Sequence, residues 1–134
     1  MFSFPNSSFD ITDSKYYKEA DIINLHWVAE FLDYETFFKK NTKPVIWTLH
    51  DMNPFSGGEH FTEEYLGINK KGLPIRRVVA ENEKEIFLKN IELKLHALKG
   101  VSNLHIVVLC NWMKNEVKKN IIFKDYPIHL IPNG

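Results

Sequence analysis

The segment from His50 to His60 carries the side chains best suited to bind a ligand. Imidazole and carboxylate groups suit Zn or Mn, and this segment has four: His50, Asp51, Glu59 and His60. No paired H-x-x-x-H or C-x-x-C spacing accompanies them, so we expect no metal here. Gly57 and Gly58 lie between the two ends and let backbone amides approach a ligand closely. The segment is predicted to be a ligand-binding loop.

Polar and aromatic residues follow each predicted strand, where open α/β sheets bind their ligands. They are His26-Trp27, His50-Asp51, Asn111-Trp112 and Asn133-Gly134. Asn111 is explained as a helix cap and Asn133 as a turn residue, because asparagine favours both kinds of position. His26 is interpreted as a half-buried histidine whose hydrogen bonds are satisfied within the fold, and not as a ligand-binding residue. The pair that remains as the strongest site candidate is therefore His50-Asp51.

The elements that would position this loop alternate between strands and helices. We expect strands at 22–27, 45–49, 106–110 and 128–131, and helices at 14–19, 31–40, 81–98 and from 111 onward. Asp13 is the expected cap of the first helix and Asn111 that of the last. This alternation predicts one Rossmann-like domain, 1–134, with a doubly wound parallel sheet, right-handed crossovers and helices on both faces.

Three details of this prediction concern packing. The continuous apolar run at 106–110 is typical of a strand covered on both faces, and its last residue, Cys110, is expected in the core. Helix 81–98 should bury an apolar stripe formed by Phe87, Ile91, Leu95 and Leu98. The last helix should bury one formed by Met113, Val117 and Ile121. Residues 50–80 are expected to form a long irregular loop, which is usually functional.

Composition narrows the class of protein. The chain has 134 residues and 44% hydrophobic content, as in a single globular domain with a sizeable core. Seventeen basic residues balance seventeen acidic ones, which argues against a nucleic-acid partner. A lone cysteine fits a reducing compartment, and no apolar run approaches the roughly 20 residues that span a bilayer. We expect a cytoplasmic protein. The dinucleotide G-x-G-x-x-G and the phosphate-binding G-x-x-x-x-G-K-[ST] patterns are absent.

The stretch WTLHDMNPFSGGEHF resembles the W-T-x-H-D-M-W-P-F-[ST]-G-G-C-H-[YF] signature of bacterial group-1, GT4-like retaining glycosyltransferases, which have the GT-B fold. Three further stretches resemble the family in order and spacing: ADIINLHWV, VVLCNWMKNEVKKN and FKDYPIHLIPNG. Asn53 stands where many relatives have Trp, and Glu59 where they have Cys. The segment 62–77 is short and lacks the cysteines of many relatives.

The resemblance implies that the chain is the core of an N-terminal, acceptor-side domain, cut at both ends. A C-terminal nucleotide-sugar domain with an E-x7-E element would follow Gly134. The whole enzyme would transfer a sugar from a nucleotide-sugar to a glycan or lipid-linked acceptor in surface polysaccharide biosynthesis, with anomeric retention and no obligatory metal or cofactor. We expect the chain alone to be inactive. Peripheral association with the inner face of the cytoplasmic membrane stays open.

Roles carried over from the family fall on the loop. His50 would contact the donor sugar, and Asp51 would orient it or hold the loop. Residues on the acceptor side or the same rim would be Phe55, Gly57, Gly58, Glu59, His60 and Asn111. Without a second domain opposite, the loop is expected to be exposed and partly mobile.

Two alternatives remain. The chain could be a non-catalytic binding or assembly domain that has kept the fold and lost the transferase chemistry. An E-x7-E element downstream would support the glycosyltransferase, and its absence would support this non-catalytic domain. A free-standing flavodoxin-like module is the other alternative, and it would require a cofactor to co-purify.

Overall fold

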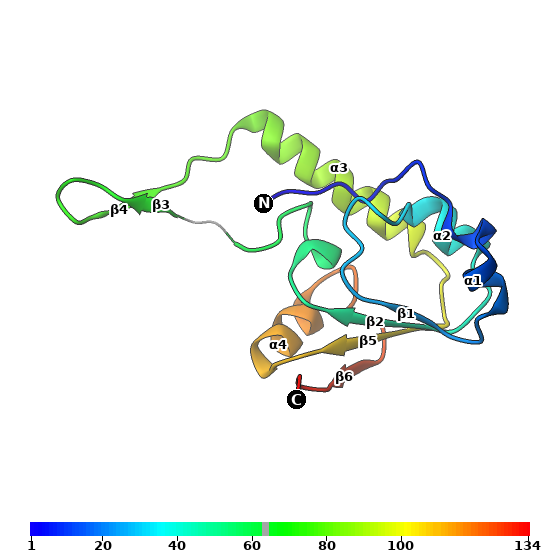
Figure 1. The fold of residues 1–134 in the computed structure, drawn as a ribbon. Helices are drawn as coiled ribbons and strands as arrows, with labels where there is room; N and C mark the ends of the chain where they lie inside the picture. The colour runs from blue at the N-terminus through cyan, green and yellow to red at the C-terminus, as the bar shows by residue number, and fades with distance from the viewer. Residues whose placement is uncertain (63–64) are drawn as a thin grey trace.

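A four-stranded, all-parallel sheet lies at the centre of the computed structural model, which describes residues 1–62 and 65–134 (Figure 1). The order is β1-β2-β5-β6, formed by Ile23–Leu25, Val45–Leu49, Leu104–Val108 and Ile128–Leu130. The predicted α/β class with a parallel sheet is confirmed. The bounds of β2 match the prediction, whereas β1 and β6 are shorter and β5 begins earlier.

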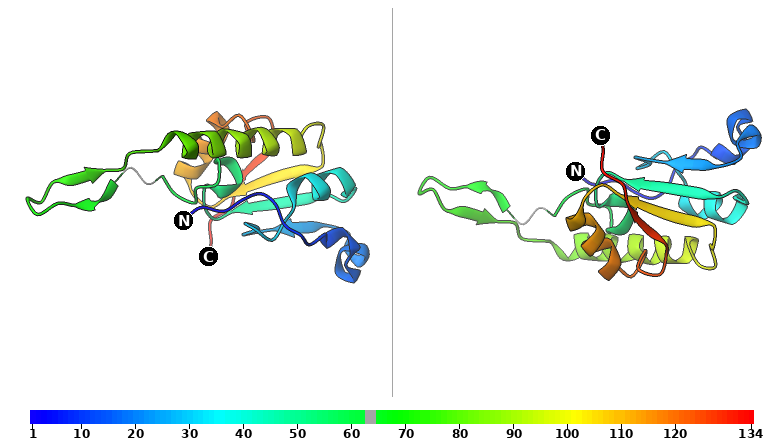
Figure 2. Two further views of the ribbon diagram at one scale, coloured as in Figure 1. Left: turned by 90° about the horizontal axis from the view of Figure 1, so that it is seen from above. Right: turned by 90° about the horizontal axis from the view of Figure 1, so that it is seen from below.

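The main helices all lie on one face of this sheet (Figures 1 and 2). They are α2 (Tyr34–Lys40), α3 (Glu81–Ala97) and α4 (Asn111–Lys119). Because the spatial order of the strands repeats their chain order, right-handed crossovers bring each helix to the same side. For α2, α3 and α4, the prediction of helices on both faces is therefore wrong.

The open face explains the alternating burial of the strands. In β2, Val45, Trp47 and Leu49 are buried and Ile46 is exposed. In β5, His105 is exposed, but Val107, which points to the same side, is only 6% exposed. The prediction that this strand is covered on both faces is therefore wrong at His105 and not at Val107. Side chains along a strand alternate between faces, and here one face meets the helices while the other is largely exposed to solvent.

An aromatic cluster fills the space between the sheet and the helices. Trp47 on β2 is fully buried, and its ring lies 5.4 Å from that of Tyr34 and 5.6 Å from that of Phe123, in edge-to-face contact. Phe37 and Phe38 add two further buried rings from α2. Such rings bury large apolar areas, and the cluster holds β2 firmly against the helical layer.

The N-terminal region forms the short helices η1 (Ile11–Asp13) and α1 (Lys15–Glu19). The predicted cap Asp13 is wrong, because the Ser14 hydroxyl accepts the Tyr17 backbone N–H at 3.1 Å and so caps α1. Helix α2 starts at Tyr34 and not at Phe31, because Asp33 caps it.

Helices α3 and α4 differ from prediction in what they bury. Along α3 the buried residues are Asn90 and Lys94, with Leu98 as the C-cap, while the predicted stripe residues before Leu98 are at most half-buried. In α4, Met113 and Val117 are buried as predicted. Ile121 lies beyond the helix end and is exposed, and Cys110 is the N-cap and exposed, not a core residue. Asn111 is the first helical residue and not the cap.

Residues 50–80 are not one irregular loop. They begin with the short helix η2 (Asn53–Phe55) and continue into an antiparallel hairpin of β3 (Tyr65–Ile68) and β4 (Pro74–Arg76). Figures 1 and 2 show this hairpin projecting from the body of the molecule. Its turn is built by Asn69, whose side chain accepts the Lys71 and Leu73 N–H groups, and by Gly72 at φ 75°.

Candidate functional site

Two exposed histidines meet at the carboxyl ends of β1 and β2. His26 directly follows β1 and His50 directly follows β2, and these strands are parallel neighbours. His26 Nδ1 lies 2.9 Å from His50 Nε2, and the rings stack with centroids 5.2 Å apart. The indole of Trp47 donates to the backbone oxygen of His26 at 3.2 Å, which ties this pair to the core. One imidazole donates and the other accepts, so each orients the other.

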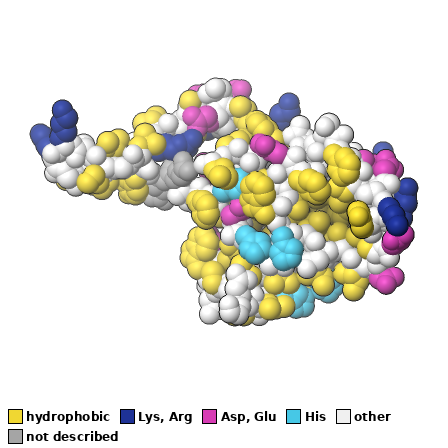
Figure 3. Space-filling view, in the orientation of Figure 1, with side chains coloured by type: hydrophobic (Ala, Val, Ile, Leu, Met, Phe, Trp, Pro, Cys, Tyr) yellow, Lys and Arg dark blue, Asp and Glu magenta, His cyan; other side chains and the backbone are white. Residues whose placement is uncertain are grey.

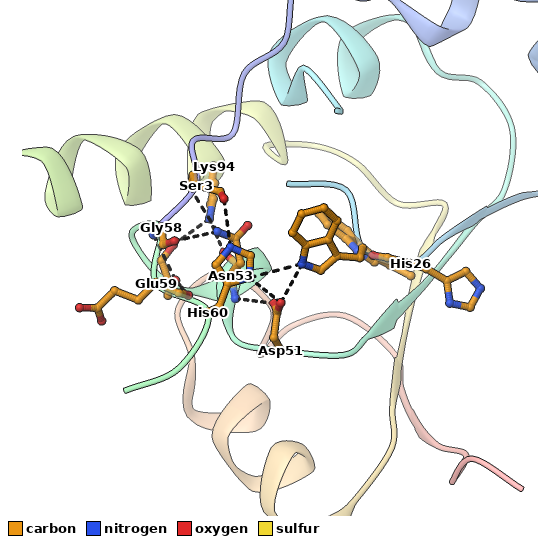
Figure 4. Close-up of polar contacts among 11 residues, drawn as sticks. Ser3, His26, Asp51, Asn53, Gly58, Glu59, His60 and Lys94 are labelled. Carbon is orange, nitrogen blue, oxygen red and sulfur yellow. Dashed lines mark hydrogen bonds and ion pairs between the residues drawn. The ribbon is translucent and has the colours of Figure 1, made fainter. Parts of the chain in front are cut away.

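Asp51, the next residue along the chain, is buried and fully engaged. Its Oδ2 atom lies 2.6 Å from His60 Nδ1 and accepts the Trp27 indole N–H at 3.0 Å, while its Oδ1 accepts the backbone N–H of Asn53 at 2.9 Å. Figure 4 shows these contacts converging on Asp51, with His26 turned away from them. A carboxylate that accepts several hydrogen bonds away from water is a structural anchor.

His60 is even more enclosed, with a side chain 1% exposed. Its Nδ1 faces Asp51, and its Nε2 lies 3.1 Å from the hydroxyl of Ser3. A neutral ring that donates through Nδ1 and accepts through Nε2 satisfies both contacts. His60 was predicted to lie on the acceptor side of the site, but its imidazole is not exposed to an acceptor in this structure.

The N-terminal segment closes over this loop. The Ser3 backbone N–H donates to Gly58 O at 2.9 Å, and the side-chain amide of Asn53 donates to Ser3 O and Gly58 O at 3.2 and 2.9 Å. The Ser56 hydroxyl donates to Glu59 O at 2.6 Å. These bonds satisfy the polar groups of a turn that would otherwise be buried without partners.

Helix α3 holds the same loop from the helical side. Lys94 is fully buried and donates to Asn53 O and, at 2.8 Å, to Ser56 O, while Asn90 donates to Gly57 O at 2.7 Å. Burial lowers the pKa of Lys94 from 10.5 to about 7, against the opposing effect of Asp51. Burial also raises the pKa of Tyr34, whose ring lies 5.6 Å from the Lys94 amine.

The predicted site residues therefore separate into distinct groups. His50 and Asn111 are exposed at the rim, following β2 and β5. Glu59 is half-buried, 3.6 Å from Arg77, and lines a cavity of about 380 Å³ beside Phe2 and Phe87. The rest are buried: Asp51, Phe55, Gly57, Gly58 and His60. The expectation of an exposed loop is wrong for these residues, because the N-terminal segment and α3 enclose them, and its mobility stays a prediction.

Sequence reasoning missed several residues that build this region. His26 was interpreted as half-buried, but it is exposed and paired with His50. The signal was available, since both histidines end neighbouring predicted strands. Ser3 and Lys94 gave no such signal, because each reaches the loop only through the tertiary fold.

The exposed pair lies on a surface and not in a pocket. The depression between His26, His50 and Pro54 has no room for a water molecule. Among residues 1–62 and 65–134, no group of three or more His, Cys, Asp or Glu side chains is placed to hold a metal ion. The contact between the rings uses His26 Nδ1 and His50 Nε2, so His26 Nε2 and His50 Nδ1 can each form a hydrogen bond with a ligand that approaches from solvent.

Comparisons of the chain with protein-family models, with curated proteins and with solved structures give no match in any of the three.

Proposed function

We propose that the chain is the acceptor-side part of a retaining glycosyltransferase of GT-B architecture. The enzyme would transfer a sugar from a nucleotide-sugar to a glycan or lipid-linked acceptor in surface polysaccharide biosynthesis. One observation carries the proposal: His50, within the motif WTLHDMNPFSGGEHF, presents an exposed imidazole at the carboxyl end of β2 while the loop behind it is locked in place. Ligands of open α/β sheets bind at such strand ends.

The proposed mechanism uses His50 for positioning. Its imidazole donates a hydrogen bond to a hydroxyl of the donor sugar, and such a bond is worth about 1 kcal/mol net, or more where it strengthens in the transition state. For this, His26 Nδ1–H donates to His50 Nε2, which fixes the orientation of the ring and leaves His50 Nδ1–H as the donor to the sugar. A second domain that faces this rim would bind the nucleotide diphosphate. The chain by itself is then expected to turn over no nucleotide-sugar.

The first test replaces His50 in the protein that contains both domains. His50→Ala should lower kcat by more than about tenfold, because the orienting hydrogen bond to the sugar is lost. His105→Ala is the matched control, since His105 forms the same kind of exposed stacked pair with His129, 3.1 Å apart, elsewhere on the open face. Release of nucleotide diphosphate measures the rate. A wild-type rate in His50→Ala would assign His50 a purely structural role.

A non-catalytic binding domain is the second candidate, and the burial of polar side chains in the motif favours it. Asp51 and His60, two of the polar side chains in the motif, are bonded to each other and shielded from solvent. Calorimetric titration of the same protein with nucleotide-sugars discriminates the two. Binding without turnover in the presence of acceptor glycans would support the binding domain and contradict the transferase.

A further inference from the structure

The hairpin of β3 and β4 stands apart from the rest of the molecule (Figures 1 and 2). In the described residues its two strands pair only with each other. Every residue of both strands is exposed. A lone two-stranded hairpin is marginally stable in water, because it buries little apolar surface.

The hairpin nevertheless carries large apolar side chains. Leu66 is 65% exposed, Ile68 is 71% exposed and Val78, just beyond β4, is 88% exposed. Tyr65, Leu73 and Ile75 are exposed as well. Neighbouring residues in a strand point to opposite faces, so Tyr65 and Leu66 place apolar groups on both sides of the hairpin. Exposed apolar side chains gathered on one element in this way mark a site of interaction.

The charges of the hairpin are all of one sign. The segment 65–79 contains four basic residues and no acidic one: Lys70, Lys71, Arg76 and Arg77. Among the four, Arg77 alone has an ion pair with the body within residues 1–62 and 65–134, through Glu59 and Glu83. Figure 3 shows hydrophobic side chains along the projection and basic side chains at its far end. Glu63 and Glu64 directly precede this segment in the sequence, so the basic excess belongs to residues 65–79 alone.

We propose that segment 65–79, called the hairpin arm below, binds the surface of an anionic lipid bilayer. Aliphatic side chains enter the boundary between headgroups and acyl chains, while Lys70 and Lys71 contact lipid phosphates. This combination of apolar and basic side chains is what anionic membrane interfaces bind. The inference goes beyond the proposed function and does not depend on sugar transfer.

The geometry favours a bilayer over other partners. Apolar groups on both faces suit a medium that surrounds the arm, whereas a folded protein would meet one face. Single-stranded nucleic acid binds aromatic platforms, and the arm offers Tyr65 alone. The arm lies in the interface and does not cross the bilayer, because its outer strand edges keep unpaired backbone groups. None of the helices within the described ranges is long and apolar enough to cross a membrane either.

Co-sedimentation of the full chain with lipid vesicles tests the proposal. The chain should bind phosphatidylcholine vesicles that contain phosphatidylglycerol and bind vesicles of phosphatidylcholine alone far more weakly. Lys70→Glu with Lys71→Glu should weaken binding by about 30-fold or more, since each basic residue near an anionic surface contributes measurably. Leu66→Ser with Ile68→Ser should weaken it as well. All four positions are exposed, so these variants are expected to fold.

Matched variants elsewhere on the chain supply the controls. Lys118→Glu with Lys119→Glu makes the same charge change on α4, and Ile121→Ser with Ile131→Ser makes the same polarity change at exposed positions. Both controls should bind like the wild type. If the control variants lost as much vesicle binding as the arm variants, the proposal would be overturned. It would also be overturned if the wild type did not bind anionic vesicles.

Insertion is measured with a polarity-sensitive fluorophore on Ile68→Cys in a Cys110→Ser background, since Cys110 is an exposed free thiol. Anionic vesicles should shift its emission to shorter wavelength and leave a label at Lys118→Cys unchanged. Self-association that Leu66→Ser with Ile68→Ser abolishes, without vesicle binding, would assign the arm to a protein partner and contradict a membrane role.

Discussion

His50 and Asp51 are adjacent in the chain but lie in opposite surroundings. His50 faces solvent beside His26, whereas Asp51 points under the loop toward Trp27 and His60. Side chains that leave a strand in succession point to opposite sides, which separates the two. At the scale of single residues, the motif therefore divides into one position open to a ligand and one that holds the scaffold.

Asp51→Ala should lower the free energy of unfolding by about 3 kcal/mol, as expected when one partner of a buried, hydrogen-bonded polar group is removed. Trp27, His60 and the Asn53 backbone N–H would lose their acceptor. His50→Ala, which is exposed, should change it by no more than about 0.5 kcal/mol. Urea denaturation followed by circular dichroism measures both. Equal midpoints for wild type and Asp51→Ala would show that the carboxylate does not hold the loop.

Lys94 should make stability depend on pH. Its pKa is about 7 in the folded chain and near the ordinary 10.5 when unfolded. Between these values the unfolded state binds more protons, so the free energy of unfolding rises with pH, by at most about 1.4 kcal/mol per pH unit. Urea midpoints should increase from about pH 7 to about pH 9.

Lys94→Met should flatten that increase, and Lys89→Met, at an exposed position of the same helix, should retain it. The two variants differ in whether the lost amine is buried. An unchanged pH slope in Lys94→Met would assign the titration to another group.

Helix α3 does more than cover the sheet, because it also forms the wall against which the loop is built. Asn90 and Lys94 bond loop carbonyls, and Phe87 packs directly on Gly57. A Cβ on Gly57 would lie 2.6 Å from the Phe87 carbonyl oxygen and would overlap the Phe87 ring. At the scale of elements, the glycine is needed for close approach of loop and helix.

Gly57→Ala should therefore destabilise the chain by about 2 kcal/mol through overpacking. Gly134→Ala is the matched control, because nothing lies within 4 Å of its Cβ position. Thermal unfolding of the two variants gives the comparison. A melting temperature for Gly57→Ala equal to that of the control would mean that α3 moves away at no cost.

Some elements were predictable from sequence and others were not. The bounds of β2 followed from a β-prone apolar run ended by His50-Asp51. The hairpin was missed because its glycines and prolines suggested an irregular loop, although Asn69 and Gly72 are turn residues. The buried face of α3 was missed because periodicity counts apolar residues, and Asn90 and Lys94 are polar residues that the loop satisfies.

For the molecule as a whole, the parallel sheet was predictable, but its one-sided cover was not. The open face carries uncharged strand residues that alternate with the core residues, of which Val107 alone is buried among the described residues: Asn24, Ile46, Thr48, His105, Val107 and His129. Parallel sheets are usually covered on both faces. Strand order decides which face the helices take, and nothing local in the sequence encodes strand order. Contacts between the loop and Ser3 were unpredictable for the same reason.

The closure of the N-terminal segment over the loop has a consequence for the order of folding. The bond between His60 and Ser3 joins residues 57 positions apart, whereas the neighbouring bond between His26 and His50 spans 24. Closing the longer span costs more chain entropy. The β1–β2 pair can therefore form before the N-terminal segment closes over the loop, whereas the pairing of Val45 on β2 with Leu104 on β5 spans as much chain as that closure. Detachment of that segment would break the Ser3 contacts while the strands stay paired and α3 still holds the loop carbonyls, which makes residues 1–5 a separate unit of local unfolding.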